Sequence, residues 1–254
     1  MSNYEKELSI ALKAAKKAGD YLVQRSNLHV DSQEGKDIKL AADRESESII
    51  VDILSQTGFP ILSEECGATE EIDWKKNYWI VDPIDGTVNY FRRLEGLSCV
   101  SIALWNNDQP ILGVVNRFEL DQVFTGVVGY GAFLNGEPIK TSAMKYISQA
   151  ILTTGFPVGC DYSSKSLQAF IKQAQRFKKV RMLGTAALMG ALVASGQVDA
   201  YIEDDIMLWD IAAAAAIVLS AGGEFIYRPF ADNKCQCRLF ASKMLAEEYD
   251  AEII

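Results

Sequence analysis

The chain has 254 residues, of which 49% are hydrophobic and 23% charged, a composition typical of a globular enzyme with a core of its own. Its 25 basic and 34 acidic residues leave a net charge of −9, which argues against a general nucleic-acid-binding protein, because such proteins present a basic face. No apolar run reaches the roughly 20 residues that span a bilayer, and the charged N-terminus does not resemble a signal peptide, so we expect a cytoplasmic protein without a membrane partner.

Hydrophobic periodicity predicts two helices in the first part of the chain, over residues 4–25 and 41–56. A polar loop that runs to Gly35 is expected between them. Two short buried strands should follow at 59–63 and 78–81, where apolar and β-branched residues gather between turn signals.

The stretches between residues 97 and 133 are apolar, partly β-branched and separated by turn residues, which predicts an antiparallel meander. Helical and strand patterns then alternate, with helices at 163–177, 185–195 and 210–221 and strands at 179–183, 198–203 and 224–228. We therefore expect a single unit over residues 1–254, built from an α+β N-terminal half (about 1–145) and an α/β C-terminal half (about 146–254), packed as sandwiched layers.

The segment YWIVDPIDGTVNY (78–90) carries the strongest chemical signal in the chain. An apolar strand ends at Asp82, Pro83 stiffens the turn, and Gly86 permits a tight backbone. Asp82 and Asp85 can therefore converge on one point, where two buried carboxylates would repel each other strongly. A hard cation such as Mg²⁺ removes that repulsion and prefers oxygen ligands, so the segment predicts a metal site.

Three other interpretations of this segment are weaker. A plain acidic turn would explain an isolated Asp-Gly pair, but not the further acidic motifs described below. A calcium loop of the EF-hand type needs Glu at position twelve, where Arg93 stands. A phosphatase of the haloacid dehalogenase type has one residue between its two aspartates, near the start of the domain, whereas two residues separate Asp82 from Asp85 and more than 80 precede them.

The sequence DPIDGT after a WIV strand resembles the inositol monophosphatase family of metal-dependent, lithium-sensitive phosphatases. Three further segments resemble the family's motifs in the same order along the chain, KDIKLAAD (36–43), LSEE (62–65) and WDIAAAAAIVLSAGG (209–223). The resemblance covers roughly residues 5–250. It implies a layered α/β/α/β/α sandwich, a phosphoric monoester hydrolase with two or three Mg²⁺ ions in its active site, and a homodimer.

The resemblance also implies roles by position. Glu64, Asp82 and the Ile84 carbonyl would hold a first metal ion, and Asp82, Asp85 and Asp210 a second. The catalytic residues that act on a metal-bound water would be Asp43, Glu64 and Thr87, and the upstream motif also contains Asp37. The backbone N–H groups of Gly86 and Thr87 would receive the phosphate. The full set expected to contact substrate is Ile84, Asp85, Gly86, Thr87, Gly184, Thr185, Ala186, Glu203 and Asp210.

The only histidine, His29, lies in a polar stretch and is not expected to act as a general base. Water activated by divalent cations needs no histidine, because a bound cation lowers the pKa of water toward neutrality. The same cations explain how an acidic protein can bind an anionic substrate.

The motifs that would face the substrate imply a small sugar or inositol phosphate, but leave its identity open. GTAA (184–187) matches the family, while its D-L-V-T element reads D-I-K-L here, with Lys39 and Leu40 in place of the usual pair. The Met207-Leu208 pair is also less polar than in inositol-specific members.

Related branches act on fructose 1,6-bisphosphate, on histidinol phosphate or on 3′(2′),5′-bisphosphate nucleotides. The nucleotidase branch is disfavoured because this chain lacks the basic residues that the branch usually shows near its S-G and E-W-D elements. A non-catalytic interaction protein is the alternative from another class. The intact set of acidic residues argues against it, because buried acids without a use cost stability.

Overall fold

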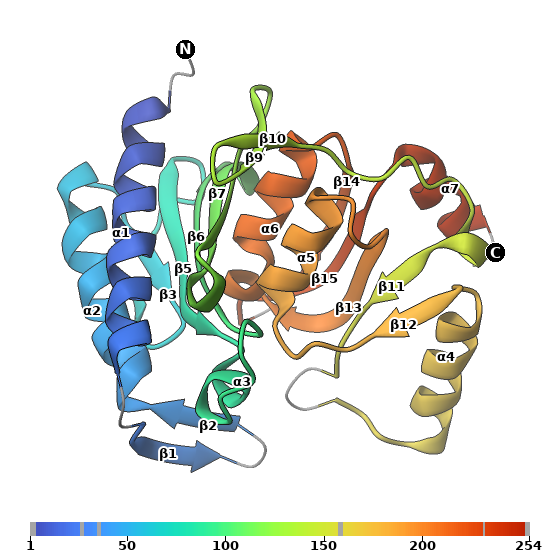
Figure 1. Ribbon diagram of the computed structural model, residues 1–254, viewed down its shortest axis with the longest axis horizontal. Coiled ribbons are helices and arrows are strands. Elements are labelled where there is room, and N and C mark those ends of the chain that lie inside the picture. Colours follow the sequence, from blue (N-terminus) through green and yellow to red (C-terminus); the bar gives the residue numbers. More distant parts are fainter. Residues whose placement is uncertain (1–3, 26–27, 35–36, 157–159, 231, 252–254) are drawn as a thin grey trace.

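Helices and two large sheets alternate as five layers in the structure, a computed structural model that describes residues 4–25, 28–34, 37–156, 160–230 and 232–251. Figure 1 shows the order of the layers, which is helix, sheet, helix, sheet, helix. The mixed α+β architecture and the α/β/α/β/α sandwich expected from the sequence are therefore confirmed.

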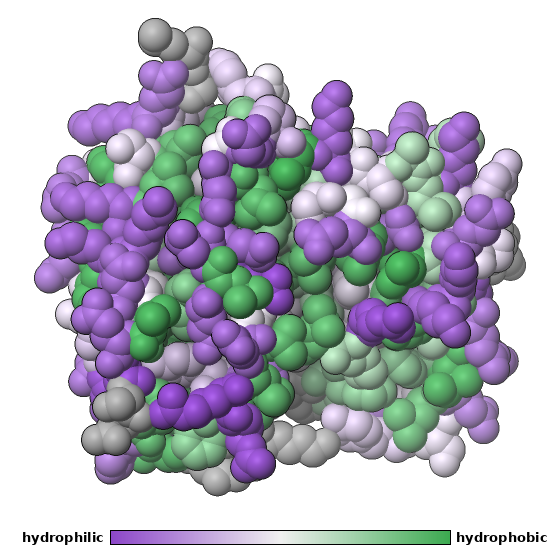
Figure 2. Space-filling model, in the orientation of Figure 1, coloured by the Kyte–Doolittle hydropathy of each residue, from purple (hydrophilic) through white to green (hydrophobic). Residues whose placement is uncertain are grey.

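The first layer consists of α1 (Glu5–Gln24) and α2 (Ala41–Leu54), close to the two helices that periodicity predicted. Four buried alanines of α1, spaced along one side of the helix, let it lie against the sheet: Ala11, Ala14, Ala15 and Ala18. In Figure 2, hydrophilic side chains line the outer edge that these helices form, as expected for a surface in contact with water.

A two-stranded antiparallel hairpin lies between these helices, where the sequence predicted a polar loop. Its strands are β1 (Val30–Glu34) and β2 (Asp37–Leu40). The loop prediction is wrong here because backbone hydrogen bonds between two short strands require no apolar pattern, and apolar pattern was the signal used.

The larger sheet has eight strands in the order β10-β9-β8-β7-β6-β5-β3-β4. Their bounds are β3 (Ile61–Ser63), β4 (Gly67–Ala68), β5 (Asn77–Asp85), β6 (Cys99–Asn106), β7 (Gln109–Arg117), β8 (Gln122–Val127), β9 (Gly131–Leu134) and β10 (Glu137–Ile139). Strands β6 to β9 form the predicted antiparallel meander, and β3 runs parallel to β5.

Strand β5 does not end at Asp82, as the sequence predicted, but continues to Asp85. Its pairing with β6 shifts register between these two residues, which is the mark of a β-bulge. A bulge turns neighbouring side chains away from strict alternation, so it sets the directions of the two carboxylates.

The second sheet has five strands in the order β12-β11-β13-β15-β14. The strands are β11 (Ile151–Thr153), β12 (Lys179–Arg181), β13 (Ala200–Met207), β14 (Glu224–Pro229) and β15 (Lys234–Phe240). Helices α5 (Ala186–Ala194) and α6 (Leu208–Ser220) lie between the two sheets, α4 (Ser164–Gln175) and α7 (Lys243–Ala251) lie beyond the second sheet, and α3 (Thr87–Phe91) follows β5.

The predicted alternation of helices and strands is confirmed in this half, to which the structure adds β11, β15 and α7. Strand β13 passes the predicted end at 203 and reaches Met207 through a register shift between Glu203 and Ile206. Helix α6 begins at Leu208, two residues before the predicted start. Among the described residues, no helix combines the length and the apolar character that a transmembrane segment needs.

Helix α6 rests directly on the larger sheet because two strands present glycine beneath it. A Cβ atom on Gly113 of β7 would overlap the carbonyl oxygen of Ala213, and one on Gly126 of β8 would lie 2.7 Å from the Cα of Ile217. This contact fixes the height of α6 above the sheet. The position of the first turn of α6 relative to β5 follows from it.

Replacement of Gly113 by alanine should therefore lower the free energy of unfolding by about 3 kcal/mol or more, because the new methyl group meets main-chain atoms that cannot rotate away. Urea denaturation would measure the loss. Gly136→Ala is the matched control: nothing lies within 4 Å of its Cβ position, and its φ of 84° alone should cost about 1 kcal/mol. Equal losses in the two variants would show that α6 does not press on β7.

Candidate active site

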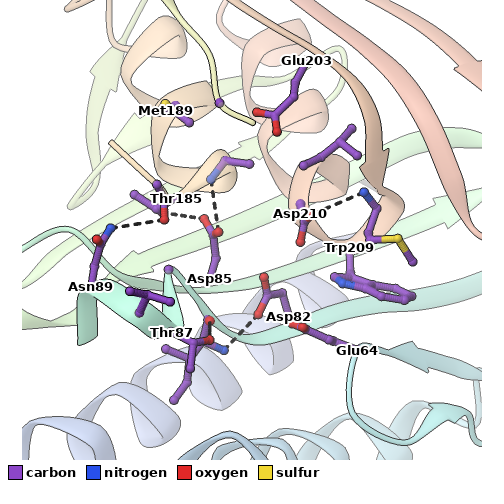
Figure 3. A pocket seen from close by; sticks show the side chains of 18 of the residues that line it. Glu64, Asp82, Asp85, Thr87, Asn89, Thr185, Met189, Glu203, Trp209 and Asp210 are labelled. Carbon is purple, nitrogen blue, oxygen red and sulfur yellow. Dashed lines mark hydrogen bonds between the residues drawn. The ribbon is translucent and has the colours of Figure 1, made fainter. Parts of the chain in front are cut away.

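A cavity of about 650 Å³ opens at the end of β5, between the two halves of the chain. Every site residue predicted from the sequence lines it except Asp43. The predicted residues on its walls are Glu64, Asp82, Ile84, Asp85, Gly86, Thr87, Gly184, Thr185, Ala186, Glu203 and Asp210. Segments as much as 146 positions apart in the sequence, from Glu64 to Asp210, thus meet at one place (Figure 3).

Three carboxylates converge on the floor of this cavity. Oxygen atoms of Glu64, Asp82 and Asp210 all lie within 4.8 Å of one another. Figure 3 shows their side chains directed toward a common space. Glu64 directly follows β3, Asp82 lies in the bulge of β5, and Asp210 belongs to the first turn of α6.

Local hydrogen bonds hold two of these side chains in place. Asp82 is buried and accepts a hydrogen bond of 3.0 Å from the backbone N–H of Ile84. Asp210 accepts one of 3.3 Å from the N–H of Met207, which precedes α6. Asp210 thus stabilises the beginning of its helix, and its carboxylate still has lone pairs that face the cavity.

The group of three carboxylates suits a divalent metal ion. Burial, followed by the nearby charge of Glu64, raises the pKa of both Asp82 and Asp210 well above the ordinary value. Negative charges this close are unfavourable unless a cation joins them. Carboxylate oxygens are the ligands that Mg²⁺ prefers, and no histidine or cysteine among the described residues belongs to the group.

Asp85 lines the same cavity but does not belong to that group of three. Its carboxylate accepts hydrogen bonds from the Thr185 hydroxyl at 2.5 Å and from the backbone N–H groups of Ala187 at 2.8 Å and Ala186 at 3.1 Å. Burial raises the pKa of Asp85, and these donors act in the opposite direction. Asp85 therefore caps the beginning of α5, a helix whose residues are all buried.

Asp43 lies behind the cavity and reaches it through Thr87. The Thr87 hydroxyl is 2.9 Å from the carbonyl oxygen of Ile84 and 3.3 Å from Oδ1 of Asp43. A hydroxyl has one proton, so it can donate to only one of these acceptors at a time. Oδ2 of Asp43 accepts a 2.7 Å hydrogen bond from the N–H of Leu40, and burial raises the pKa of Asp43 to about 7.

Gly86 stands where only glycine fits. Its φ of 86° is left-handed, and a Cβ atom there would lie 2.7 Å from the carbonyl oxygen of Leu97 and 3.1 Å from the Cβ of Thr185. The backbone can therefore turn sharply from the bulge of β5 into α3, whose first N–H groups have no acceptor within the helix.

Glu203 lines the part of the cavity that the second sheet forms. The Tyr201 hydroxyl donates a 3.0 Å hydrogen bond to it, and burial raises the pKa of Glu203 to about 7. A Cβ atom at Gly155 would lie 2.8 Å from its carboxylate, so the absence of a side chain there leaves Glu203 room. In Figure 3 its carboxylate points toward the same space as Asp210.

Sequence reasoning did not single out several other residues on these walls as site residues. Asn89 donates hydrogen bonds to the carbonyl oxygens of Leu97 (2.8 Å) and Leu183 (2.7 Å), and so ties α3 to the loop before α5. Lys39, noted only as a departure from the family pattern, and Lys234 also line the cavity. Lys39 lies in the KDIKLAAD segment but departs from its pattern, and Lys234 lies in no recognised motif, so only the fold shows that both reach the cavity. His29 is exposed and does not line the cavity.

Known proteins resemble this chain over nearly its full length. The sequence model described as the inositol monophosphatase family matches residues 3–236. An inositol monophosphatase of Dictyostelium discoideum is 36% identical over 228 residues, which cover 85% of this chain and 82% of that protein. A fructose-1,6-bisphosphatase/inositol-1-monophosphatase of Thermotoga maritima is 36% identical over 222 residues, again 85% of this chain and 82% of the relative.

A solved structure agrees with the sequence comparison. The inositol monophosphatase of Anabaena superposes with a TM-score of 0.84 at 30% identity, over 99% of this chain and 97% of that one. Together with the carboxylates gathered at the end of β5, these matches show that the chain belongs to the inositol monophosphatase family, whose members are metal-dependent hydrolases of small phosphate monoesters.

Proposed function

We propose that this chain is a Mg²⁺-dependent phosphomonoesterase that hydrolyses a small sugar or inositol phosphate with an activated water molecule as the nucleophile. The observation that carries the proposal is the convergence of Glu64, Asp82 and Asp210 within 4.8 Å on the floor of a cavity large enough for a small sugar phosphate. Both halves of the chain supply these walls, so we also propose that residues 1–254 act as one unit.

Glu64, Asp82 and Asp210 would hold the first ion, a grouping that differs from the one the resemblance implies, because their oxygens lie within 4.8 Å of one another. Asp85 and the carbonyl of Ile84 lie on the same wall and would contribute to a second ion. A carboxylate has about four lone-pair sites, so Asp85 can cap α5 and bind a cation as well. Bound Mg²⁺ would lower the pKa of a water molecule and offset the charge that develops on the phosphoryl oxygens.

Thr87 and Asp43 would position the attacking water and take its proton. The Thr87 hydroxyl faces the cavity, and Asp43 lies directly behind it with a pKa of about 7. A pKa near the working pH suits a group that accepts a proton and later releases it. Asp43 reaches the reaction only through Thr87, so the hydroxyl is the part that touches the water.

The remaining walls would bind the two ends of the substrate. The N–H groups of Gly86 and Thr87, which line the cavity, would receive the phosphate, and residues 184–186 and Glu203 would contact the hydroxyl groups of the polyol. A carboxylate such as that of Glu203 can accept hydrogen bonds from two adjacent hydroxyls.

No side chain of the protein is needed as the nucleophile. Cys99 lies beside the site, 3.5 Å from Asp85, but burial and the neighbouring carboxylates raise the pKa of its thiol well above the ordinary value, which disfavours the reactive thiolate. His29 is exposed and does not line the cavity. Water is therefore the proposed nucleophile.

The relative from Thermotoga maritima supports fructose 1,6-bisphosphate as a second candidate substrate, because the name of that protein includes both activities. Lithium sensitivity, a homodimer and a cytoplasmic location stay predictions from the sequence.

We expect Mg²⁺-dependent release of phosphate from inositol 1-phosphate, fructose 1,6-bisphosphate, or both, because the cavity accommodates a small polyol beside the carboxylates. A colorimetric phosphate assay should be run on a panel that also includes adenosine 3′,5′-bisphosphate, each substrate with and without Mg²⁺ and with and without Li⁺. Faster release from the nucleotide than from either sugar ester would redirect the assignment. If no substrate yields phosphate, the result supports the alternative that the chain is a non-catalytic interaction protein.

The variant Asp210→Asn should weaken Mg²⁺ binding by at least about tenfold and abolish turnover, because one of three converging charges is lost. The amide oxygen can still accept the hydrogen bond from Met207 and one repelling charge is gone, so the melting temperature in EDTA should be no lower than that of the wild type. Calorimetric titration with Mg²⁺ measures the affinity. The control is Asp204→Asn, which removes a charge 60% exposed and paired with Arg238 at 3.6 Å, outside the cavity lining. Equal losses in the two variants would mean that the ligand is misassigned.

Replacement of Thr87 by valine should lower kcat by about 10²- to 10⁴-fold while KM changes little, because the variant loses the hydroxyl that contacts water but keeps the shape of the side chain. Thr87→Ser retains the hydroxyl and should retain most of the activity. Steady-state kinetics on the best substrate of the panel compares them. A valine variant as active as the serine variant would exclude the proposed role of the hydroxyl.

A further inference from the structure

Lys39 places a positive charge at the edge of the carboxylate group. It lies in β2 and lines the same cavity as Glu64. Its Nζ is 3.1 Å and 3.2 Å from the two carboxylate oxygens of Glu65, the residue that directly follows Glu64. The Glu65 side chain is only 9% exposed, while that of Lys39 is 41% exposed. The lysine therefore reaches from the solvent side of the cavity toward a nearly buried acid.

The backbone under Lys39 is held firmly. Lys39 pairs with Ser32 across the β1–β2 hairpin. The next residue, Leu40, is fully buried, and its N–H donates to Asp43. The origin of the lysine side chain is thus fixed relative to Asp43, while its four-carbon stem is flexible.

Carboxylates outnumber cations among the described residues that line the cavity, so each ammonium group there matters for the binding of an anion. Six carboxylates line the cavity: Glu64, Asp82, Asp85, Glu203, Asp205 and Asp210. Among the described lining residues, the cations are Lys39 and Lys234. Lys234 comes from the other half of the chain and pairs with Asp205 at 2.9 Å, so Lys39 is the one that pairs with Glu65, the neighbour of Glu64 in sequence.

We propose that Lys39 binds the phosphate group of the substrate, and that it exchanges part of its contact with Glu65 for a contact with a phosphoryl oxygen. The inference rests on the proposed function, because it takes the phosphate to lie beside the carboxylates. A lysine ammonium group is a compact charge with three donors, which suits a phosphate whose remaining oxygens face metal ions. Its partial exposure and fixed origin allow it to serve both partners.

The proposal has two opposite consequences for binding. A cation beside Glu64 and Glu65 repels Mg²⁺ in the free protein, so its removal should tighten Mg²⁺ binding. The same cation attracts phosphate, so its removal should weaken phosphate binding. A lysine that only supports the fold would not move the two affinities in opposite directions.

The test uses the variant Lys39→Met, which keeps an unbranched side chain without the charge, with Lys39→Arg as the conservative variant and Lys234→Met as the matched control in the same cavity. Calorimetry should measure Mg²⁺ binding to each protein, and then binding of inorganic phosphate at saturating Mg²⁺. We expect Lys39→Met to lose phosphate affinity roughly tenfold and to bind Mg²⁺ several-fold more tightly. Lys39→Arg should retain phosphate binding, and Lys234→Met should change phosphate binding by less than about threefold.

Unchanged phosphate affinity in Lys39→Met would overturn the proposal. Equal effects of the two methionine variants would also overturn it, because phosphate binding would then depend on the net charge of the cavity and not on the position of Lys39. Melting temperatures identify any variant that does not fold, and the arginine variant then decides the question, since the proposal requires it to bind phosphate. Failure of the wild-type protein to bind phosphate with Mg²⁺ present would count against the proposed function itself, so the two failures are distinguishable.

Discussion

Repulsion among closely spaced carboxylates is the constraint on which the site depends. Glu64, Asp82 and Asp210 come from three segments and meet within 4.8 Å, where burial raises the pKa of the two aspartates. Such a group lowers the stability of a fold that makes no use of it. The layers on either side must therefore be rigid enough to hold these charges together, and the close contact of α6 with glycines of the larger sheet supplies that rigidity on one side.

The same acidic residues that would act in catalysis also shape the elements that carry them. Asp43 and Asp210 each accept a hydrogen bond from the backbone N–H three residues earlier, at the beginning of α2 and α6, and Asp85 caps α5. At the beginning of each of these three helices an aspartate thus accepts hydrogen bonds from N–H groups that a helix end leaves without an acceptor. Function and local stability are combined in one set of side chains.

Much of this arrangement could be predicted from the sequence, because short acidic motifs between an apolar strand and a helix have few structural solutions. The layers, the meander and the approach of Glu64 and Asp210 to the segment 82–87 belong to that part. The hairpin β1–β2 was missed because it lacks an apolar pattern, and β15 and α7 were not assigned. The orientation of Asp85 depends on Thr185, one hundred positions later, and Lys39 drew notice only as an unusual residue. Contacts between residues so far apart in the sequence depend on the tertiary fold and cannot be predicted from the local sequence pattern.

The contact of Asp85 with α5 joins the two halves of the chain at the point where the ions would bind. Strand β5 belongs to the first sheet, while α5 follows β12 of the second, and three hydrogen bonds to one carboxylate span them. If the two halves separated, the buried Asp85 would be exposed to solvent, and the first N–H groups of α5, a helix whose residues are all buried, would lose their acceptor. An ion that binds Asp85 would therefore also stabilise the contact between the two halves of the chain.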